Sequence, residues 1–305
     1  MINYTYALSG FVLKTNFHLP ELTVVHGPSN FEIIVNDQIS AAFPITSLRN
    51  FFFKKNDSTL IYIKRAKMGY IEVCEKKKLV FTPLSSLSDA EIKMHILGTC
   101  YMLASACLGY FSFHAACVVI NGKAVLFCGD SGAGKSTLAA HFFNKGYTVL
   151  SDDVTNIKIL PAGEISVFPS LPRIKLSVDT LSQLRKSTDG LSEIGGPKIK
   201  YSLPINDFPD QLTFKLGCIV FPTFTDDGNC SILPMINNLK KSELSNNFYR
   251  AKLSLELHTK NKLDEVVSIL TQAVDMFSFT RPSYSVSVNE NINFIEEKLL
   301  GIIKP

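Results

Sequence analysis

The chain has 305 residues, of which 46% are hydrophobic and 19% charged, a balance typical of a globular protein with one large domain or two. The formal net charge is only +4, and no basic run is longer than Lys76-Lys77-Lys78, so there is no electrostatic case for a nucleic-acid partner. Seven cysteines include no C-x-x-C pair, and residues 1–4 lack the pattern of a signal peptide. We therefore expect reduced thiols and a cytoplasmic location.

Residues 1–86 predict a β-rich module, because short apolar segments alternate with turn residues such as Gly27-Pro28. No side-chain pattern there indicates chemistry, and His18 and His26 are expected to be structural or surface residues. The module would serve as a substrate-docking surface, as an assembly surface of a homo-oligomer, or only as a stabilising subdomain.

Residues 87–305 are expected to form a second domain, which begins with a helix. Ser88 and Glu91 have the spacing of a capping box, and the helix is predicted to run to about Leu108. Residues 96–122 contain no Lys, Arg, Asp or Glu, so a membrane span is an alternative. Gly, Ser, Thr and His within the run favour a core helix followed by a buried strand, and no membrane partner is expected.

A glycine-rich loop follows the apolar segment 124–128 directly. Its sequence, G-D-S-G-A-G-K-S-T at 129–137, fits the pattern G-x-x-x-x-G-K-[ST] and precedes a predicted helix. Such a loop points backbone N–H groups at phosphates, its lysine reaches the β- and γ-phosphates, and its serine hydroxyl ligates magnesium. We expect the nucleotide to be bound by Gly129, Asp130, Ser131, Gly132, Ala133, Gly134, Lys135, Ser136 and Thr137. A turn that only connects two elements is the alternative.

Two adjacent acidic residues follow the next predicted strand. Segment 147–151 ends in Asp152-Asp153, and only one helix and a turn at Gly146 separate it from Ser136. Both strand ends can therefore open onto one crevice, with the carboxylates beside the magnesium and the γ-phosphate. A solvated turn is the alternative interpretation of the pair.

These motifs resemble a known family. The residues that carry the resemblance are His114, the loop 129–136, Lys145-Gly146-Tyr147 and Ser151-Asp152-Asp153. They are similar to the catalytic domain of HPr kinase/phosphorylase, whose nucleotide fold is related to phosphoenolpyruvate carboxykinase. Segments 6–11, 19–22 and 168–176 also resemble HPr-kinase-related proteins of lasso-peptide and other peptide-modification gene clusters. The resemblance is dense over residues 112–155 and weaker elsewhere.

The resemblance implies an α/β chain, with a phosphoenolpyruvate-carboxykinase-like, HPr-kinase-like P-loop domain after the β-rich module. It implies a serine kinase that uses ATP and Mg²⁺ and acts on a peptide or small protein, including a lasso-peptide-type precursor. Asp152 takes the role of general base, and Ser136 with Asp153 holds the metal. The glutamate-isoleucine-arginine-glycine stretch associated with phosphorolysis is not found, so the reverse reaction is not expected.

Two further residues enter the site through the resemblance. His114 would neighbour the catalytic aspartate and orient it or stabilise its charge, although a histidine in an apolar stretch can also be a core residue. Arg173 lies where the family supplies active-site residues, and its guanidinium would stabilise the transferred phosphoryl group together with Lys135. A surface arginine is the alternative.

The remaining sequence completes an α/β layer. Residues 181–200 are rich in Gly, Ser and charge and predict a mobile flap, from which Lys200 would contact phosphate. A strand is predicted at 216–221 and another at 284–288, with helices near 236–250 and 263–276 and from about Ile292. Two other functions stay open, a small-molecule kinase of the same fold and a nucleotide-binding scaffold or sensor. The Asp-Asp pair argues against the scaffold, because binding alone needs fewer acids.

Overall fold

The computed structural model describes residues 3–37, 51–55, 58–63, 68–84, 86–194, 199–226, 228–283 and 288–304. The chain divides into two compact units, Met1–Tyr110 and Phe111–Pro305, which are described separately below. The described residues form a mixed α/β structure with several sheets, so the coarse fold class expected from the sequence is confirmed.

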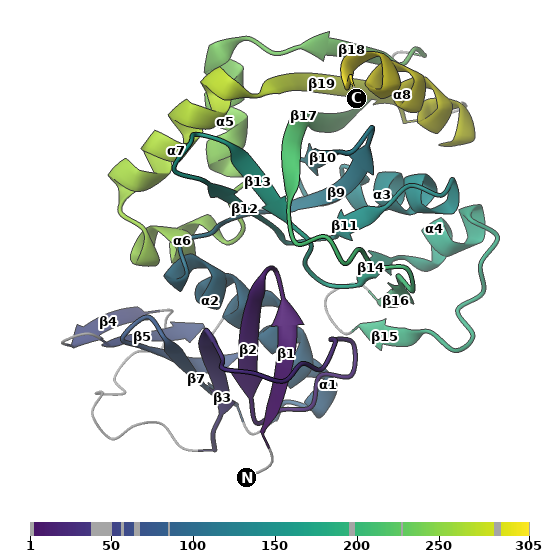
Figure 1. Cartoon of the computed structure of the whole chain (residues 1–305). Helices are drawn as coiled ribbons and strands as arrows, with labels where there is room; N and C mark the ends of the chain where they lie inside the picture. The colour runs from purple at the N-terminus through teal and green to yellow at the C-terminus, as the bar shows by residue number, and fades with distance from the viewer. Residues whose placement is uncertain are drawn as a thin grey trace. The chain divides into compact units, whose positions relative to one another are not determined.

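The first unit contains a seven-stranded sheet in the order β1-β2-β3-β7-β6-β5-β4 (Figure 1). The strands are β1 (Tyr4–Leu8), β2 (Phe11–Thr15), β3 (Phe31–Val35), β4 (Phe51–Lys55), β5 (Ser58–Ile63), β6 (Gly69–Cys74) and β7 (Lys78–Pro83). Strand β3 pairs parallel with β2 and β7, and the other neighbours are antiparallel. These strands fall in the region that the sequence predicts to be β-rich.

The predicted capping box starts the helical segment of this unit. Ser88 accepts a hydrogen bond from the Glu91 N–H, and the Ser88 N–H donates to Glu91 Oε2 at 2.9 Å. Helix α1 (Asp89–His95) continues through a π-helical turn (Ile96–Cys100) into α2 (Tyr101–Cys107). Among the described residues, no helix is long and apolar enough to cross a membrane.

This helical segment belongs to the first compact unit. The sequence assigns it to the second domain, which would begin at residue 87, whereas the compact units divide after Tyr110. The reason is packing, because the ring of Tyr101 stacks on Phe11 of β2 with 6.4 Å between centroids, and its hydroxyl is hydrogen-bonded to Ser9. Both contacts tie the segment to the sheet of the first unit.

The second unit is built on a nine-stranded sheet. Its main path runs β11 (Val149–Ser151), β9 (Ala115–Ile120), β10 (Lys123–Cys128), β17 (Phe214–Thr225), β13 (Ile165–Phe168), β12 (Thr155–Ile159) and β8 (Phe111–Phe113). Strand β19 (Asp275–Pro282) pairs with β17, and β18 (Ser231–Pro234) pairs with β19. Strands β10 and β19 run parallel to β17, and the other pairs are antiparallel.

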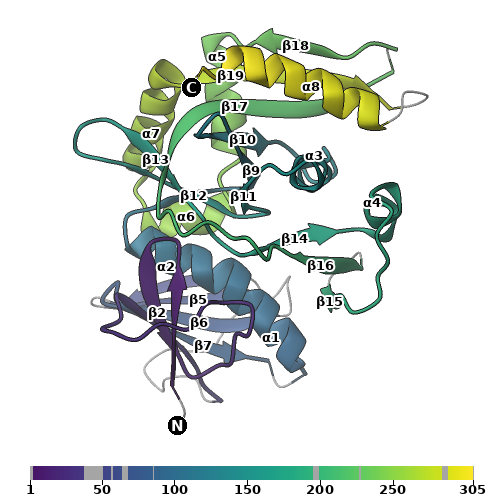
Figure 2. The ribbon, with the colours of Figure 1, turned by 45° about the vertical axis from the view of Figure 1, so that its right-hand side comes forward.

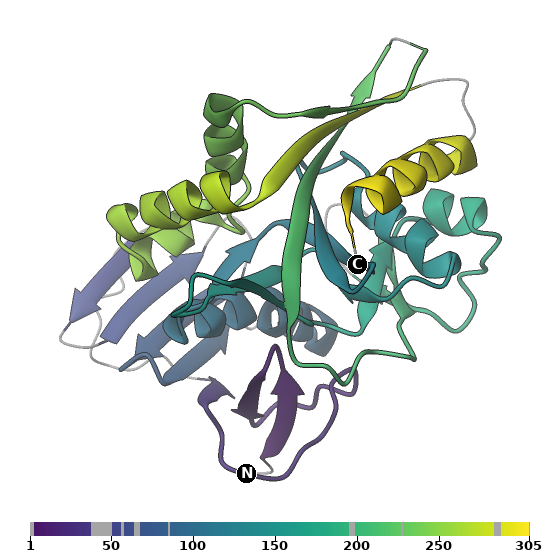
Figure 3. The same cartoon turned by 45° about the horizontal axis from the view of Figure 1, so that its top comes forward.

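Helices cover both faces of this sheet (Figure 3). On one face, α5 (Asn237–Asn246) and α7 (Lys260–Ala273) contribute Leu244 and Leu270 to a core that includes Leu126 of β10. On the other, α3 (Lys135–Asn144) and α8 (Val288–Ile302) bury Phe142 and Ile295. Helix α6 (Ala251–Leu257) follows α5. The predicted strand at 284–288 lies outside the described residues except for Val288, which begins α8.

A small three-stranded sheet lies beside α3 (Figure 2). Its order is β14 (Arg173–Leu176), β16 (Lys200–Pro204) and β15 (Ser192–Ile194), and helix α4 (Val178–Gln183) follows β14. Ile174 and Leu176 of β14 join the core against α3, so this sheet is fixed to the same face as the glycine-rich loop. Within the predicted flap 181–200, α4 and β15 account for part of the chain, and residues 195–198 lie outside the described residues.

Candidate active site

Three strand ends meet at one edge of the large sheet. Strands β10 and β11 both pair antiparallel with β9, so their carboxyl ends lie at the same edge as the amino end of β9. The glycine-rich loop leaves β10 at this edge, Asp152 and Asp153 follow β11, and His114 directly precedes β9. The convergence predicted from the short spacing between loop and acidic pair is therefore present in the fold.

The glycine-rich loop turns tightly into α3. Gly129, Gly132 and Gly134 have φ angles of +142°, +95° and +80°, a region that other residues rarely adopt. Lys135, the first residue of α3, donates from Nζ to the carbonyl oxygens of Gly129 at 2.7 Å and Asp130 at 2.9 Å. These carbonyls hold the ammonium at the rim of the loop, and burial lowers the pKa of Lys135 below its ordinary value.

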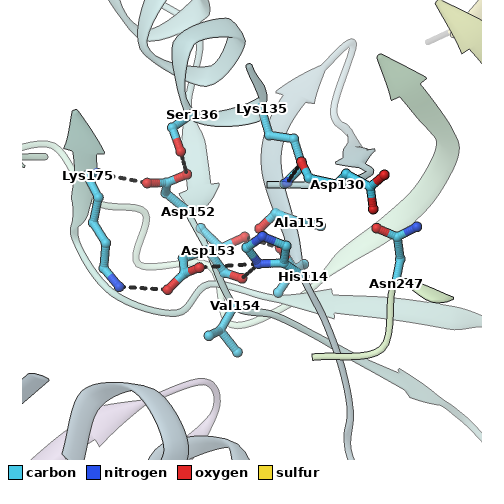
Figure 4. Close-up of polar contacts among 12 residues, drawn as sticks. His114, Ala115, Asp130, Lys135, Ser136, Asp152, Asp153, Val154, Lys175 and Asn247 are labelled. Carbon is cyan, nitrogen blue, oxygen red and sulfur yellow. Dashed lines mark hydrogen bonds and ion pairs between the residues drawn. The ribbon is translucent and has the colours of Figure 1, made fainter. Parts of the chain in front are cut away.

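Asp152 is tied to the loop (Figure 4). Ser136 Oγ donates to Asp152 Oδ1 at 2.7 Å, and the backbone N–H of Lys175 donates to Oδ2, also at 2.7 Å. The residue is only 2% exposed. Burial raises the pKa of Asp152 above its ordinary value, although the two hydrogen bonds work in the opposite direction. Its carboxylate is thus a buried oxygen ligand beside the loop serine.

Asp153 points to a different set of partners. Its Oδ2 lies 2.7 Å from Lys175 Nζ, and its Oδ1 lies 3.2 Å from His114 Nδ1. The side chain is 24% exposed, more than that of its neighbour. Burial acts to raise its pKa, but Lys175 and His114 outweigh burial and hold the pKa of Asp153 well below its ordinary value. The carboxylate is therefore ionised at neutral pH, between a lysine and a histidine.

The backbone of Asp153 is unusual as well. Its φ is +79°, in the left-handed region, where aspartate and asparagine are tolerated better than most residues. A strained backbone beside a partly buried ion pair is typical of functional sites. It turns Asp153 toward His114 while Asp152 faces Ser136.

The hydrogen of the His114 ring can be placed from its partners. Nδ1 lies 3.1 Å from the carbonyl oxygen of Asp153 and 3.2 Å from its Oδ1. Both atoms can only accept, so Nδ1 carries a proton, and in the neutral ring Nε2 is the acceptor. The backbone N–H of His114 donates to the carbonyl of Asn247 at 2.8 Å, which fixes the residue at the sheet edge.

The geometry gives Ser136 a different acidic partner from the one expected at the metal. The sequence pairs Ser136 with Asp153, whereas the Ser136 hydroxyl is bonded to Asp152, because the left-handed backbone at Asp153 turns that side chain toward His114. The oxygen donors beside the loop are therefore Ser136 and Asp152. Among the described residues, no three His, Cys, Asp or Glu side chains gather to hold a metal.

A cavity of about 380 Å³ lies over the loop. The loop and the start of α3 contribute Ser131, Gly132, Gly134, Lys135, Ser136 and Thr137 to its lining, which also includes His114, Asp152, Asp153, Lys175, Thr180 and Lys200. The predicted loop residues Gly129 and Asp130 instead line a second hollow of about 300 Å³, together with Asn247, Tyr249 and Arg250. His114 and Ser131 belong to both, so the two hollows adjoin.

The segment in which the sequence predicts an active-site arginine contains two cations, Arg173 and Lys175. Both lie in β14, and Lys175 is the residue that lines the cavity and pairs with Asp153. Arg173 is 5% exposed and buried near the start of the strand. Lys175 is thus the cation of this segment that faces the cavity, and Lys200, which is expected to contact phosphate, also lines it; the role of Arg173 stays a prediction.

Three residues of the site were missed in the sequence. Asn247, after α5, accepts a hydrogen bond from the Gly129 N–H through Oδ1 at 2.7 Å. Tyr249 lines the second hollow, and burial, followed by the charge of Asp153, raises its pKa to about 12. Arg281 of β19 donates to the carbonyl of Ala133 at 2.7 Å. None has a local motif, and no sequence signal indicated them.

Comparisons with known proteins found matches among solved structures alone. No family model matches the chain, and no curated protein matches it either. Among solved structures, the HPr(Ser) kinase/phosphatase from Coxiella burnetii matches with a TM-score of 0.32 and 13% sequence identity, over 62% of this chain and 88% of that chain. The function of this chain is therefore argued from its own side chains.

Proposed function

We propose that the chain is an ATP- and Mg²⁺-dependent kinase that phosphorylates a seryl hydroxyl on a peptide or small protein, with an HPr-kinase-like P-loop domain in its second unit. The observation that carries the proposal is the meeting of Lys135 and Ser136 with Asp152, Asp153 and His114 at one sheet edge. A loop that only connects two elements would need none of these partners. The motif resemblance described above supports serine as the acceptor and a lasso-peptide-type precursor as a candidate substrate.

The cavity fits the phosphates of a nucleotide. Its volume of about 380 Å³ lies within the range of small-molecule sites, about 300–1,000 Å³. Lys135, Lys175 and Lys200 line it and supply positive charge from three elements. The donors beside Ser136 also fit magnesium, which is held by one or two carboxylates and by the oxygens of the substrate phosphates. When bound, the metal offsets the negative charge of the transferred group.

We assign Asp152 with Ser136 to the metal and Asp153 to the general base. Asp152 is nearly inaccessible, and both of its oxygens already accept hydrogen bonds. Asp153 is ionised and more exposed, and it lines the cavity next to His114. In the reaction, the seryl oxygen forms the bond to the γ-phosphorus, the bond to ADP breaks, and Asp153 accepts the hydroxyl proton. This assignment reverses the roles inferred from the sequence.

The second hollow supplies a place for the acceptor. It meets the cavity at His114 and Ser131, so a hydroxyl entering from this side arrives next to Asp153. Tyr249 and Arg250 line it, and they offer a hydroxyl donor and a guanidinium to a polar peptide. The segment is anchored to β8 by the bond from the Tyr249 N–H to the Ser112 carbonyl, so its position relative to His114 is fixed.

The test is incubation with γ-labelled ATP, magnesium and the precursor peptide encoded beside the gene. We expect label on a seryl oxygen of the peptide, located by mass spectrometry and lost when that serine is replaced by alanine. The Asp153→Asn variant serves as the inactive control. Transfer only to small alcohols would favour a small-molecule kinase, and nucleotide binding without any transfer would favour a scaffold; either result would overturn the proposed function.

A further inference from the structure

Arg281 contacts the glycine-rich loop from strand β19. It lies in β19 and is 6% exposed, and its Nη2 donates to the Ala133 carbonyl at 2.7 Å. The guanidinium lies 4.4 Å from the ring centroid of Phe224, its partner on β17, and 5.7 Å from that of Phe279. A residue far along the chain is thus packed against the last turn of the loop.

The charge of Arg281 has no carboxylate to balance it. Within the described part of the chain, no acidic side chain lies at ion-pair distance from it, and its buried Nη1 has no hydrogen-bond partner. Burial lowers the pKa of Arg281 to about 10, so the group is still charged at neutral pH. An unpaired buried cation is costly to a fold, because the interior disfavours an isolated charge. A bound anion near the loop would offset this cost.

The guanidinium also determines what residue can follow Ala133. A Cβ added at Gly134 would lie 2.1 Å from Arg281 Nη2 and 3.8 Å from the ring of Phe224. Gly134 has a φ of +80° and caps α3, and the next residue is Lys135. Arg281 therefore contacts both residues that lead into the loop lysine.

We propose that Arg281 is a positioning residue for anion binding, which fixes the Ala133–Gly134 end of the loop and places behind it a positive charge that a bound phosphate chain offsets. The inference rests on the proposed function, since it requires the loop to bind phosphates. Arg281 is not catalytic in this account, because it acts through Ala133 and Gly134. The anion would be held by the loop N–H groups, and the buried cation would strengthen that binding from the other side.

If Arg281 has this role, its substitution should lower the affinity for the anion without lowering the stability of the free protein. Arg281→Gln removes an uncompensated buried charge, and its amide can still donate to the Ala133 carbonyl, so the free protein should unfold at the same temperature as the wild type or higher. Its affinity for the anion should fall about 3- to 30-fold, the range for residues that act on a site through a neighbour. Arg281→Lys keeps the charge but loses the planar fork, and it should recover part of the affinity.

The experiment is calorimetric titration of the full chain with inorganic pyrophosphate and, separately, with MgATP, together with thermal unfolding of the free protein. The exposed Arg185 supplies a matched control, since Arg185→Gln makes the same charge change away from the loop. We expect affinity for the anion to be highest in the wild type and Arg185→Gln, lower in Arg281→Lys and lowest in Arg281→Gln. The unfolding temperature of the free protein should not fall along this series.

The outcomes are distinguishable. Wild-type protein that binds neither pyrophosphate nor MgATP overturns the proposed function and this inference with it. Wild-type binding with unchanged affinity in both Arg281 variants overturns the inference alone. If Arg281→Gln unfolds, the comparison rests on Arg281→Lys, and a less stable Lys variant with wild-type affinity would show that the arginine is only structural.

Discussion

Asp153→Asn isolates the proposed base from the rest of the site. Asparagine has the same shape and tolerates the left-handed φ of +79°, so the backbone should be retained. The substitution removes the negative charge between Lys175 and His114. General base help contributes about 10²- to 10⁴-fold, so transfer should fall by that factor, about 3–5 kcal/mol of barrier. Affinity for ATP should change little, because Lys135, Ser136 and Asp152 are intact.

The same substitution should destabilise the fold moderately. The ammonium of Lys175 loses a carboxylate 2.7 Å away, and the two side chains are 14% and 24% exposed. Breaking a fully buried pair costs about 3–5 kcal/mol and losing an exposed one about 0–1, so this partly exposed pair should contribute about 1–3 kcal/mol. For a domain of about 150–250 residues, this corresponds to a drop of about 2–12 °C in Tm.

The stability difference should depend on pH with a definite sign. The pKa of Asp153 is lowered in the folded state, so its stabilisation is present above the pKa of an unfolded aspartate and is lost as pH falls. The gap in Tm between wild type and Asp153→Asn should therefore narrow as the solution is acidified below about pH 4. Scanning calorimetry across a pH series measures this directly.

A double-mutant cycle and a rate assay complete the test. In a Lys175→Met background, Asp153→Asn should cost less stability than in the wild type, because its ion-pair partner is already gone.

Rates are measured with γ-labelled ATP and the acceptor peptide. If Asp153→Asn retains transfer within about threefold, while Asp152→Asn abolishes it and leaves MgATP affinity unchanged, the base is Asp152 and the argument from geometry is wrong.

Three further predictions concern the neighbouring groups. Asp152→Asn should weaken binding of MgATP more than binding of metal-free ATP, which titrations with and without magnesium measure. The free variant should be as stable to thermal unfolding as the wild type or more stable, because burial disfavours the charged carboxyl. His114→Ala should lower kcat about 10- to 100-fold with ATP affinity retained, since it removes a hydrogen bond to the base; an unchanged steady-state rate would exclude that role. Phosphopeptide with excess phosphate should yield no pyrophosphate, because phosphorolysis needs a second anion held in line; pyrophosphate release would contradict this.

The parts of the site that could be predicted are those formed by residues adjacent in the sequence. The loop 129–137 and the acidic pair are each contiguous, and one short connection brings them to the same sheet edge. The distinction between the two aspartates was not available from the sequence. It depends on which way each side chain leaves β11, and the left-handed turn at Asp153 decides this.

The residues that were missed reach the site through tertiary packing. Asn247 and Arg281 contact the loop from α5 and β19, and no spacing in the sequence links them to residues 129–134. The segment that forms β19 was not predicted as a strand, and the helix predicted at 263–276 overlaps its first two residues, Asp275 and Met276. The sequence likewise does not reveal which sheet the helical segment before Tyr110 covers, because residues 96–107 carry no charged side chain to mark an exposed face.

Titration of the wild-type chain and of Lys135→Ala with MgATP asks whether the loop at the edge of β10 and β11 is a nucleotide site. The account predicts one site per chain in the wild type and at least about tenfold weaker binding in the variant, since the lysine supplies a charge-assisted contact to phosphate. Burial already disfavours the Lys135 ammonium, so the variant should unfold within a few degrees of the wild type. Equal affinity of the two folded proteins for MgATP would contradict the assignment of residues 129–136 as a phosphate loop.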